Sequence, residues 1–583
     1  MALTISVAGA KLIASSLYDL GVRVIFGIVG IPVIEVADAC IERGIRFISF
    51  RNEQSASYAA TAYGYLTGKP GVCLVVGGPG VLHAIAGIGN STHNCFPLLV
   101  LGGSSESHQV YKGAFQEIDQ VSTLTPFTKF AGRPASLSLL PSTIEKAYRL
   151  AYYGRPGATY IDLPADYIQG RVDPSETQQL YPASAAPKIA ADAARVKKAA
   201  QLIRNAQLPL VIIGKGAAYG QAEGAIRELI DKSSIPFLPT PMGKGIVPDS
   251  SPLNFAAARS AILRTSDVIL LLGGRLNWIL HYGEPPKFKE GVKIIQVDIA
   301  SEEIGNNNSS NVQYGLVGDI QLVTRQLSAE LQDYRFSSIP SALIETREKN
   351  LAASEKKANH TAMPLTYQHS YKIIKDAIRA TKTKVIYISE GANTMDIARS
   401  AFDVEEPRQR LDAGTMATMG VGIGYAIAAA VACPDHLPVC IEGDSAFGFS
   451  AMELETATRS NLPMAIFVMN NNGVYHGVEP TAYSATSGNP LPSTALGFET
   501  RYDLIAEAVG GKGFVARTAK ELKKAATDAL TNRAVTVVNV IIDPGAKTKL
   551  VCLDCCCSLV GLLIVIQEFG WLASTKKKPL SKL

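Results

Sequence analysis

Oxygen ligands for a divalent cation follow two predicted strands in the last third of the chain. From Glu442 the sequence reads EGDSAFGFSAMELETATRSNLPMAIFVMNNNGVY, an acidic loop, a helix and a second apolar strand. Asp444 offers a carboxylate oxygen, Asn471 an amide oxygen and Gly473 a backbone carbonyl. Because Mg²⁺ takes its oxygen ligands from carboxylates, phosphates and water, this pattern predicts a magnesium ion that holds a diphosphate. The alternative is a plain turn in which Asp444 caps a helix.

A second acidic residue stands at the start of a predicted helix in the first part of the chain. The run FISFRNEQSASYAATAYGYLTGKPG places Glu53 where an apolar strand meets a helix rich in Ala and Tyr. Tyr58, Ala59 and Ala62 leave nearly every face of this helix apolar or small, which predicts that the helix is buried. A buried carboxylate needs a partner. The alternative is a solvated first-turn acid, which the helix dipole favours.

Together the two segments resemble the cofactor motifs of thiamine diphosphate enzymes, in which Gly-Asp-Gly is followed after a fixed interval by Asn-Asn. The chain departs from this pattern at Ser445, where the family has Gly. The resemblance implies thiamine diphosphate and Mg²⁺ as cofactors. It assigns to Glu53 a bond to N1′ of the cofactor's aminopyrimidine. It makes Asp444, Asn471 and Gly473 the metal ligands.

The same resemblance predicts further cofactor contacts in the last third of the chain. Met419 is expected to wedge between the two rings of thiamine, although Met is also a common filler of gaps in cores. Small residues at 414–424 permit close approach of the backbone to a ligand. The predicted cofactor contacts are Glu53, Gly391, Ala392, Asn393, Met419, Gly443, Ser445, Ala446 and Asn471.

Length and composition describe a large globular protein. At 583 residues the chain exceeds what one hydrophobic core organises, so about three or four domains are expected. Its content of 47% hydrophobic and 18% charged residues excludes intrinsic disorder. The net charge of +5 is scattered and forms no basic stripe, so nucleic-acid binding has no support.

Apolar strands alternate with helices along three stretches of the chain, a pattern typical of parallel sheets covered on both faces. The sequence therefore predicts an α/β fold of three consecutive doubly wound parallel-sheet domains, as in thiamine diphosphate enzymes. By the resemblance, the three are a pyrimidine-binding domain (1–171), a central nucleotide- or CoA-binding domain (193–327) and a diphosphate- and metal-binding domain (362–544). An atypical tail (545–583) follows them. Because the family binds each cofactor between domains of two subunits, the resemblance implies a homodimer or homotetramer.

The central domain contains Gly-rich turns after strands, which can bring backbone amides against phosphate or merely connect strand to helix. The resemblance implies an adenine-containing ligand here, the CoA part of an acyl-CoA substrate or ADP as a bound effector. Asp298, at a strand end, is the candidate for a ribose hydroxyl. The predicted CoA or nucleotide contacts are Arg155, Lys215, Gly216, Arg275 and Asp298.

Several short motifs narrow the resemblance to one branch of the family. GAFQEIDQ, GKGAAY, RLNWIL, EGANTMD and EGDSAFGFS look like the oxalyl-CoA decarboxylases and 2-hydroxyacyl-CoA lyases. Both activities break the carbon–carbon bond beside a thioester carbonyl and release formyl-CoA, with the cofactor as electron sink. The decarboxylases carry Tyr-Glu where this chain has Phe115 and Gln116, so the lyase reaction, which expels a shortened aldehyde, is favoured.

Two polar residues are candidates for contact with the substrate. Gln116 is expected to donate a hydrogen bond to the reaction intermediate, the alternative being a solvated loop residue. Tyr475 is expected to line the pocket or to act in proton transfer. Two other functions stay open from the sequence, an oxalyl-CoA decarboxylase and a noncatalytic CoA-binding relative.

The end of the chain carries a predicted address and an unusual segment. Ser581, Lys582 and Leu583 form a peroxisomal targeting signal, which predicts binding to the import receptor, a matrix location and a part in fatty acid α-oxidation. The segment 549–567, KLVCLDCCCSLVGLLIVIQ, departs from the family. A membrane-contacting tail, a buried apolar insert and the translation of a retained intron compete to explain it. The intron is favoured, and no membrane span is expected.

Overall fold

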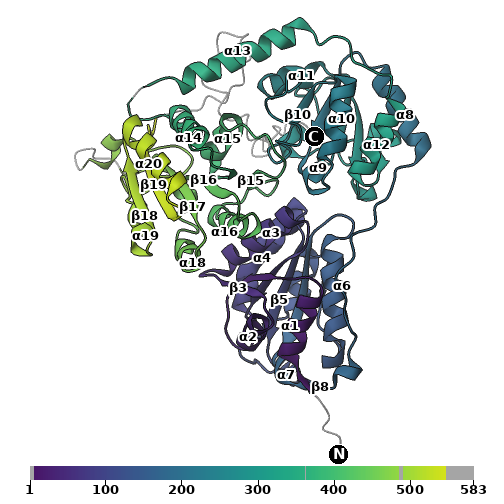
Figure 1. Ribbon diagram of the computed structural model, residues 1–583, viewed down its shortest axis with the longest axis vertical. Helices are drawn as coiled ribbons and strands as arrows, with labels where there is room; N and C mark the ends of the chain where they lie inside the picture. The colour runs from purple at the N-terminus through teal and green to yellow at the C-terminus, as the bar shows by residue number, and fades with distance from the viewer. Residues whose placement is uncertain (1–5, 362, 485–489, 546–583) are drawn as a thin grey trace, which may run out of the picture. The chain divides into compact units, whose positions relative to one another are not determined.

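The structure is a computed structural model and describes residues 6–361, 363–484 and 490–545. Three parallel sheets with flanking helices follow one another along the chain, so the predicted fold class is confirmed (Figure 1). The segment 549–567 and the residues 581–583 lie outside the described ranges. Within those ranges, no helix combines the length and the apolar character that crossing a bilayer requires.

The first domain is built on a six-stranded parallel sheet with the strand order β3-β2-β4-β5-β7-β6. Its strands are β2 (Val24–Gly27), β3 (Arg46–Ser49), β4 (Gly71–Val75), β5 (Leu98–Ser104), β6 (Phe130–Gly132) and β7 (Ala158–Pro164). Its helices are α1 (Gly9–Asp19), α2 (Ile34–Glu42), α3 (Glu53–Thr67), α4 (Pro79–Asn94), α5 (Gln120–Leu124), α6 (Leu140–Tyr152) and α7 (Ala165–Gln169). A short antiparallel pair, β1 (Val7–Ala8) with β8 (Arg171–Val172), joins the two ends of the domain.

The central domain has a five-stranded parallel sheet with the order β10-β9-β11-β12-β13. Its strands are β9 (Pro209–Ile213), β10 (Phe237–Pro239), β11 (Val268–Leu272), β12 (Lys293–Asp298) and β13 (Leu316–Val317). Its helices are α8 (Ala193–Arg204), α9 (Lys215–Tyr219), α10 (Glu223–Ser233), α11 (Arg259–Thr265) and α12 (Ile320–Glu330).

The third domain has a six-stranded parallel sheet with the order β15-β14-β16-β17-β19-β18, which repeats the strand order of the first domain. Its strands are β14 (Val385–Glu390), β15 (Arg410–Asp412), β16 (Leu437–Gly443), β17 (Met464–Asn470), β18 (Lys512–Ala516) and β19 (Val535–Ile541). Its helices are α14 (Tyr367–Thr381), α15 (Ala392–Ala401), α16 (Gly422–Ala432), α17 (Asp444–Phe447), α18 (Glu453–Arg459), α19 (Asp503–Ala508) and α20 (Ala519–Thr531).

The connector before the third domain contains a helix that the sequence pattern did not predict. This helix, α13 (Ser341–Ala358), buries Leu343 and leaves its other side chains partly or fully exposed. The side chains are exposed because the sequence of α13 has no apolar stripe. Such a stripe is the main signal from which a helix is predicted.

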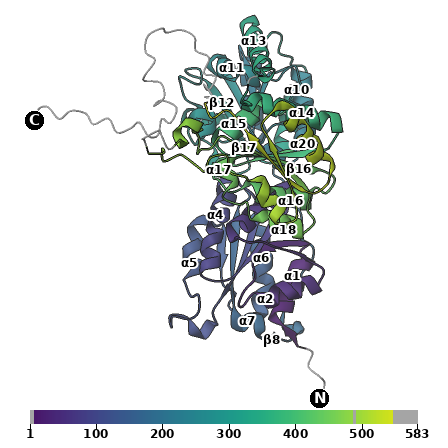
Figure 2. The same ribbon diagram turned by 90° about the vertical axis from the view of Figure 1, so that its left-hand side faces the viewer.

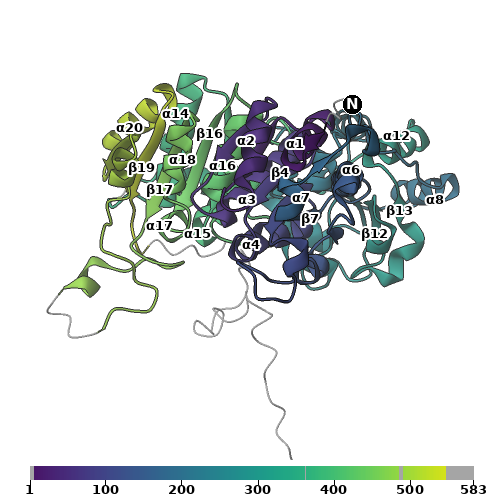
Figure 3. The same cartoon turned by 90° about the horizontal axis from the view of Figure 1, so that it is seen from below.

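Helices cover both faces of the third sheet, α14 and α20 on one and α16 and α18 on the other (Figure 3). Successive side chains of a strand point to opposite faces. Phe467 of β17 therefore packs in the core with α14 and α20, whereas Ile466 packs in the core with α16 and α18. This explains why β17, MAIFVMN, is apolar along nearly its whole length.

Helix α3 has a suitable capping residue at each end. Asn52 caps the N-terminus, where its side chain accepts a hydrogen bond from the Gln54 amide at 2.7 Å. Gly68 ends the helix in the left-handed conformation, with φ of 71°. These signals place Glu53 in the first turn of a helix whose middle is buried.

The first and third domains meet where α3 packs on α16 (Figures 1 and 2). The two backbones approach closely because Gly424 has no side chain: a Cβ at this position would lie 2.8 Å from the Ser55 carbonyl oxygen. A buried hydrogen bond of 2.8 Å from Asn90 Nδ2 on α4 to the Tyr425 hydroxyl on α16 also joins the two domains.

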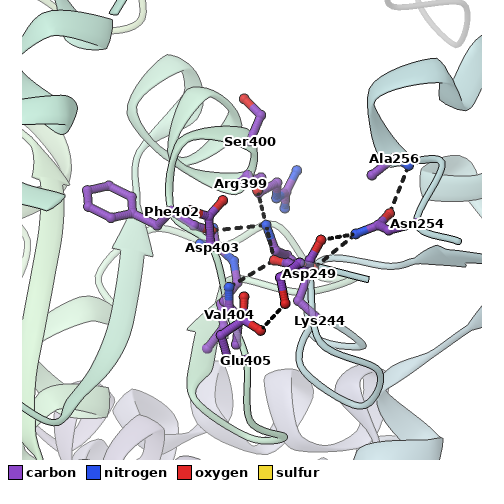
Figure 4. A network of polar contacts seen from close by, with 12 residues as sticks. Lys244, Asp249, Asn254, Ala256, Arg399, Ser400, Phe402, Asp403, Val404 and Glu405 are labelled. Atoms are coloured by element: carbon purple, nitrogen blue, oxygen red, sulfur yellow. Dashed lines mark hydrogen bonds and ion pairs between the residues drawn. The ribbon is translucent and has the colours of Figure 1, made fainter. Parts of the chain in front are cut away.

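A polar joint connects the central and third domains (Figure 4). Lys244 lies 2.9 Å from Asp249 and donates to the carbonyl oxygens of Arg399 (2.6 Å) and Phe402 (3.0 Å). Asp249 accepts from the Val404 amide at 2.9 Å. Because both charged groups are mostly buried, these bonds offset the loss of their hydration.

Replacing Gly424 with Ala is expected to destabilise the protein, although Ala is the better helix former. The new Cβ would lie 2.8 Å from the Ser55 carbonyl oxygen, so the two helices must separate, which costs about 1–3 kcal/mol. Thermal unfolding followed by circular dichroism measures the effect. Gly224→Ala in α10 is the control, since a Cβ there meets no atom within 4 Å. Equal midpoints for the two variants would contradict a close contact at Gly424.

Candidate active site

Two loops of the third domain meet at the carboxyl ends of β14 and β16. These strands are neighbours in the sheet although β15 lies between them in sequence, so the strand order reverses here. Ligands of open α/β sheets bind at such a reversal. Gly391 follows β14 with φ of 89°, and a Cβ there would lie 3.2 Å from the Gly443 amide nitrogen. Glycine at 391 thus allows both the backbone conformation and the close approach.

Asp444 is buried at this point, and only backbone amides satisfy its carboxylate. Its Oδ2 accepts from the amides of Asn471 and Gly473, each at 3.2 Å, and its Oδ1 accepts from the Ser445 amide at 2.8 Å. Burial raises the pKa of Asp444 to about 6, and no cationic side chain among the described residues opposes this effect. A buried acid without a cation is the arrangement that a bound metal ion completes.

The neighbouring groups suit a hard cation and a diphosphate. The Asn471 side-chain oxygen accepts from the Gly473 amide at 3.1 Å, which holds it beside Asp444. Asn393 donates to the Tyr475 carbonyl at 2.7 Å and so connects the two loops. No side chain caps the N-terminus of α15 at Ala392, and the N-terminus of a helix is an end at which anions bind.

The donor set for a metal is small. Within the described ranges, no group of three or more His, Cys, Asp or Glu side chains could hold a metal ion. One carboxylate, one amide oxygen and a backbone carbonyl match Mg²⁺, which retains water and phosphate ligands. Ser445 and Ala446 stand in the first turn after Gly443, and Ala446 packs against Gly391.

A pair of buried carboxylates, which the sequence reasoning missed, lies directly behind these loops. Glu390 and Glu442 are partners in the register of β14 and β16. Glu390 accepts from the amides of Gly420 and Gly422, and burial raises its pKa to about 7. Burial and the neighbouring Glu390 raise the pKa of Glu442, whose oxygens have no partner among the described residues. The sequence pattern places each acid at the end of a strand, but it does not show that the two acids lie opposite each other.

Met419 lies in the loop that Glu390 holds. This residue is partly buried. Its carbonyl accepts from the Thr418 hydroxyl at 3.2 Å, and that hydroxyl lies 3.1 Å from the hydroxyl of Tyr58 on α3. The first domain therefore contacts the loop that carries Met419, the residue expected to wedge between the two rings of the cofactor.

Glu53 lies at the start of α3 with its side chain 14% exposed. Its Oε2 is 3.0 Å from Nδ1 of His83 on α4. The turn before it is held by the third domain, because both oxygens of the buried Glu453 accept from the Arg51 amide at 3.2 Å. Thr456 donates to the same carboxylate at 2.7 Å. The sequence did not indicate Glu453, since an acid in a first helical turn usually faces solvent.

The two predicted substrate contacts lie in separate loops. Gln116 has φ of 56°, and a Cβ at Gly78 would lie 2.5 Å from its carbonyl oxygen, so its backbone rests on the turn before α4. Its neighbour Phe115 is 68% exposed. Tyr475 has φ of 67° and packs edge-on against His476 at 4.2 Å between ring centroids.

Two of the predicted nucleotide contacts line a cavity of about 60 Å³ between the central and third domains. Lys215 donates to Asn94 Oδ1 at 2.6 Å, and burial lowers its pKa to about 7. Arg275 donates to the carbonyl oxygen of His93 and to the Thr415 hydroxyl. The cavity has room for a few water molecules and is far smaller than a nucleotide site. Both cations are therefore engaged within the protein.

The other three predicted nucleotide contacts lie outside that cavity lining. The Gly216 amide donates to the Gly273 carbonyl at 3.0 Å, which joins two Gly-rich turns to each other. Arg155 of the first domain forms ion pairs with Asp298 at 2.9 Å and Glu303 at 2.7 Å. In the described structure, Arg155 and Asp298 bridge two domains.

Comparison with protein families identifies the class of enzyme. Residues 7–123 match the N-terminal TPP binding domain of thiamine pyrophosphate enzymes, residues 196–327 match their central domain and residues 390–540 match their C-terminal TPP binding domain. Thiamine pyrophosphate is another name for thiamine diphosphate. The chain belongs to the thiamine pyrophosphate enzymes, and the predicted cofactor is that of the family.

Curated relatives narrow the family further. The chain is 46% identical to 2-hydroxyacyl-CoA lyase 1 of Homo sapiens over 560 residues, which cover 93% of this chain and 96% of the relative. It is 44% identical to 2-hydroxyacyl-CoA lyase of Saccharomyces cerevisiae, over 92% of this chain and 97% of the relative. Oxalyl-CoA decarboxylase of Escherichia coli (strain K12) is 39% identical, over 93% of this chain and 96% of the relative. The predicted resemblance to this branch is confirmed.

The stability that the protonated Glu453 contributes is expected to be lost as pH rises. Burial raises the pKa of Glu453 from 4.5 to about 7, so the folded protein binds this proton more tightly than the unfolded chain. The resulting stability is complete below about pH 4.5 and is lost as pH rises through 7. Glu453→Gln carries no such proton. The unfolding midpoint of the variant should therefore rise relative to wild type between pH 5 and 8.

Glu455→Gln on the same helix is the matched control for this measurement. Glu455 is bonded to Arg459, and this bond lowers its pKa, so the carboxylate stays ionised across the same pH range. The difference in unfolding midpoint between Glu455→Gln and wild type should stay constant across this pH range. If the midpoint difference between Glu453→Gln and wild type also stayed constant, the raised pKa of Glu453 would be contradicted.

Proposed function

We propose that this protein is a thiamine diphosphate-dependent carbon–carbon lyase that cleaves a 2-hydroxyacyl-CoA into formyl-CoA and a shortened aldehyde. The observation that carries the proposal is the buried Asp444, which has no cationic partner among the described residues and lies where the strand order reverses. Relatives named as lyases, 42–46% identical over most of the chain, support the choice of reaction.

The residues of the third domain would hold the cofactor by its charged end. Asp444, Asn471 and the carbonyl of Gly473 would bind Mg²⁺, and the amides after Gly391 and Gly443 would face the diphosphate. When bound, thiamine supplies the electron sink for breaking the carbon–carbon bond. The protein's own part is to orient the groups and to exclude water.

The residues of the first domain would act at the other end of the cofactor. Glu53 would bond the pyrimidine, and Gln116 would donate to the substrate. Phe115 supports the lyase over the decarboxylase, because its exposed ring offers an apolar surface to an acyl chain and no hydroxyl to a second carboxylate. Tyr475 would line the same space from the third domain.

We also propose that the enzyme works as a homodimer or homotetramer, with each cofactor between two subunits. Phe449, which lies beside Gly420 in the Met419 loop, and Met452 are 56% and 57% exposed, and Ile31 of the first domain is 69% exposed. Such an assembly would cover apolar side chains of this kind. Binding of CoA or ADP beside Lys215 and Arg275 would require the small cavity there to open.

The peroxisomal matrix is the proposed location. It rests on the terminal Ser-Lys-Leu, outside the described residues, and on the suitability of that compartment for 2-hydroxy fatty acyl-CoA breakdown.

Purified protein with thiamine diphosphate and Mg²⁺ is expected to release formyl-CoA from a 2-hydroxyacyl-CoA. Turnover of oxalyl-CoA under the same conditions should be much slower. Glu53→Gln should lower kcat by about 10²- to 10⁴-fold, because the amide cannot exchange a proton with the pyrimidine. Chromatography of the CoA products measures both rates. Faster turnover of oxalyl-CoA would instead identify a decarboxylase, and no turnover of either would support a noncatalytic CoA-binding protein.

Asp444→Asn is expected to lower the affinity for thiamine diphosphate by about a hundredfold at fixed Mg²⁺, because a charged metal ligand is lost. Isothermal titration calorimetry with and without EDTA measures the affinity and its dependence on metal. Asp435→Asn, an exposed position in the same domain, is the control. Unchanged, metal-dependent binding in Asp444→Asn would contradict the proposed metal site.

A further inference from the structure

His83 is the one described residue that forms a hydrogen bond with the Glu53 side chain. Its Nδ1 lies 3.0 Å from Glu53 Oε2, and the two side chains are 61% and 14% exposed. His83 lies in the second turn of α4, a helix that neither the motifs nor the proposed function used. The pair joins the candidate pyrimidine ligand to a group that can both donate and accept a hydrogen bond.

The packing of α3 against α4 determines that these two side chains meet. One turn further along each helix, Ser57 faces Gly87, and a Cβ at Gly87 would lie 2.1 Å from the Ser57 hydroxyl oxygen. Residues four apart in a helix lie on the same face. This close contact therefore sets the register of the helices and brings Glu53 opposite His83. The contact between Glu53 and His83 is therefore determined by the packing of the two helices.

The other carboxylate oxygen of Glu53 faces Gly80. A Cβ at Gly80 would lie 3.6 Å from Oε1 and 2.6 Å from a methyl carbon of Val76. Glycine at this position keeps the space beside Oε1 clear of a side chain. Thus one oxygen is held by His83, and the other is left for a ligand.

We propose that His83 is a positioning residue for the reaction: by bonding Oε2 of Glu53, it fixes the carboxyl so that Oε1 meets the cofactor's pyrimidine. This inference rests on the proposed function. A neutral imidazole suits the task, because a protonated Nδ1 donates to a carboxylate and an unprotonated Nδ1 accepts from a carboxylic acid. His83 can therefore stay bonded whether or not Glu53 carries a proton. A Lys or Arg could only donate and would favour the ionised form.

Exchange of the thiazolium C2 proton in deuterium oxide tests this role without any CoA substrate. The holoenzyme is quenched in acid at set times, and the remaining C2 proton is measured by NMR. His83→Gln should slow the exchange by about tenfold to a hundredfold, because its amide does not reach the place of Nδ1. In His83→Asn the amide nitrogen stands near the place of Nδ1, so the rate should stay within about threefold of wild type. Calorimetry should show an affinity for thiamine diphosphate within about tenfold of wild type for both variants.

A second His–Glu pair provides the matched control. His108 lies 3.2 Å from Glu106, with side chains 66% and 37% exposed, so it is an exposed histidine bonded to a different carboxylate than Glu53. His108→Gln should exchange at the wild-type rate. If His83→Gln exchanged at the wild-type rate while Glu53→Gln exchanged slowly, the role of His83 would be overturned and the proposed function would stand. Wild-type exchange in Glu53→Gln, or no binding of thiamine diphosphate to the wild type, would overturn the proposed function itself.

Discussion

The contact between α3 and α16 is the constraint on which the rest of the candidate site depends. The two helices belong to different domains and carry few groups that form strong interactions. What brings them together is the absence of a side chain at Gly424, which lets the α16 backbone approach Ser55. Because Glu53 starts α3 and the Met419 loop precedes α16, this contact fixes how the two segments stand relative to each other within one chain.

Several acids around that contact are buried and form no ion pair within the described ranges. Asp444, Glu390 and Glu453 are bonded mainly to backbone amides, and Glu442 has no partner among the described residues. Burying an unpaired charge is unfavourable, so such groups persist where a proton or a ligand compensates for it. Asp444 starts α17 in the loop after β16, whereas Glu390 and Glu442 stand near the ends of β14 and β16, and Glu453 stands in the first turn of α18. Of the four, Asp444 is the one that we propose as a ligand of a cation.

The first and third domains use one strand order for two tasks. In both, the segments that carry site residues follow the carboxyl ends of parallel strands, the neighbours β14 and β16 in the third domain and β3 and β4, on either side of β2, in the first. The third domain places Asp444 and Gly391 there, which we propose for the charged tail of the cofactor. The first domain places Glu53 and the Gly-rich turn before α4 there, and we propose Glu53 for the pyrimidine ring. The same backbone plan thus carries different side chains in the two domains.

The sequence by itself determined the fold class and the residues with chemistry to offer. Alternating apolar strands and helices predicted three parallel sheets, and the motifs around Asp444 and Glu53 were enough to indicate the family. The α13 helix was not predicted, because it has no apolar stripe. The structure alone showed Glu390 opposite Glu442, Glu453 on the Arg51 amide and His83 on Glu53. Each pair joins residues far apart in the chain or on neighbouring strands, and which of them meet is decided by helix packing and strand register, which local patterns do not encode.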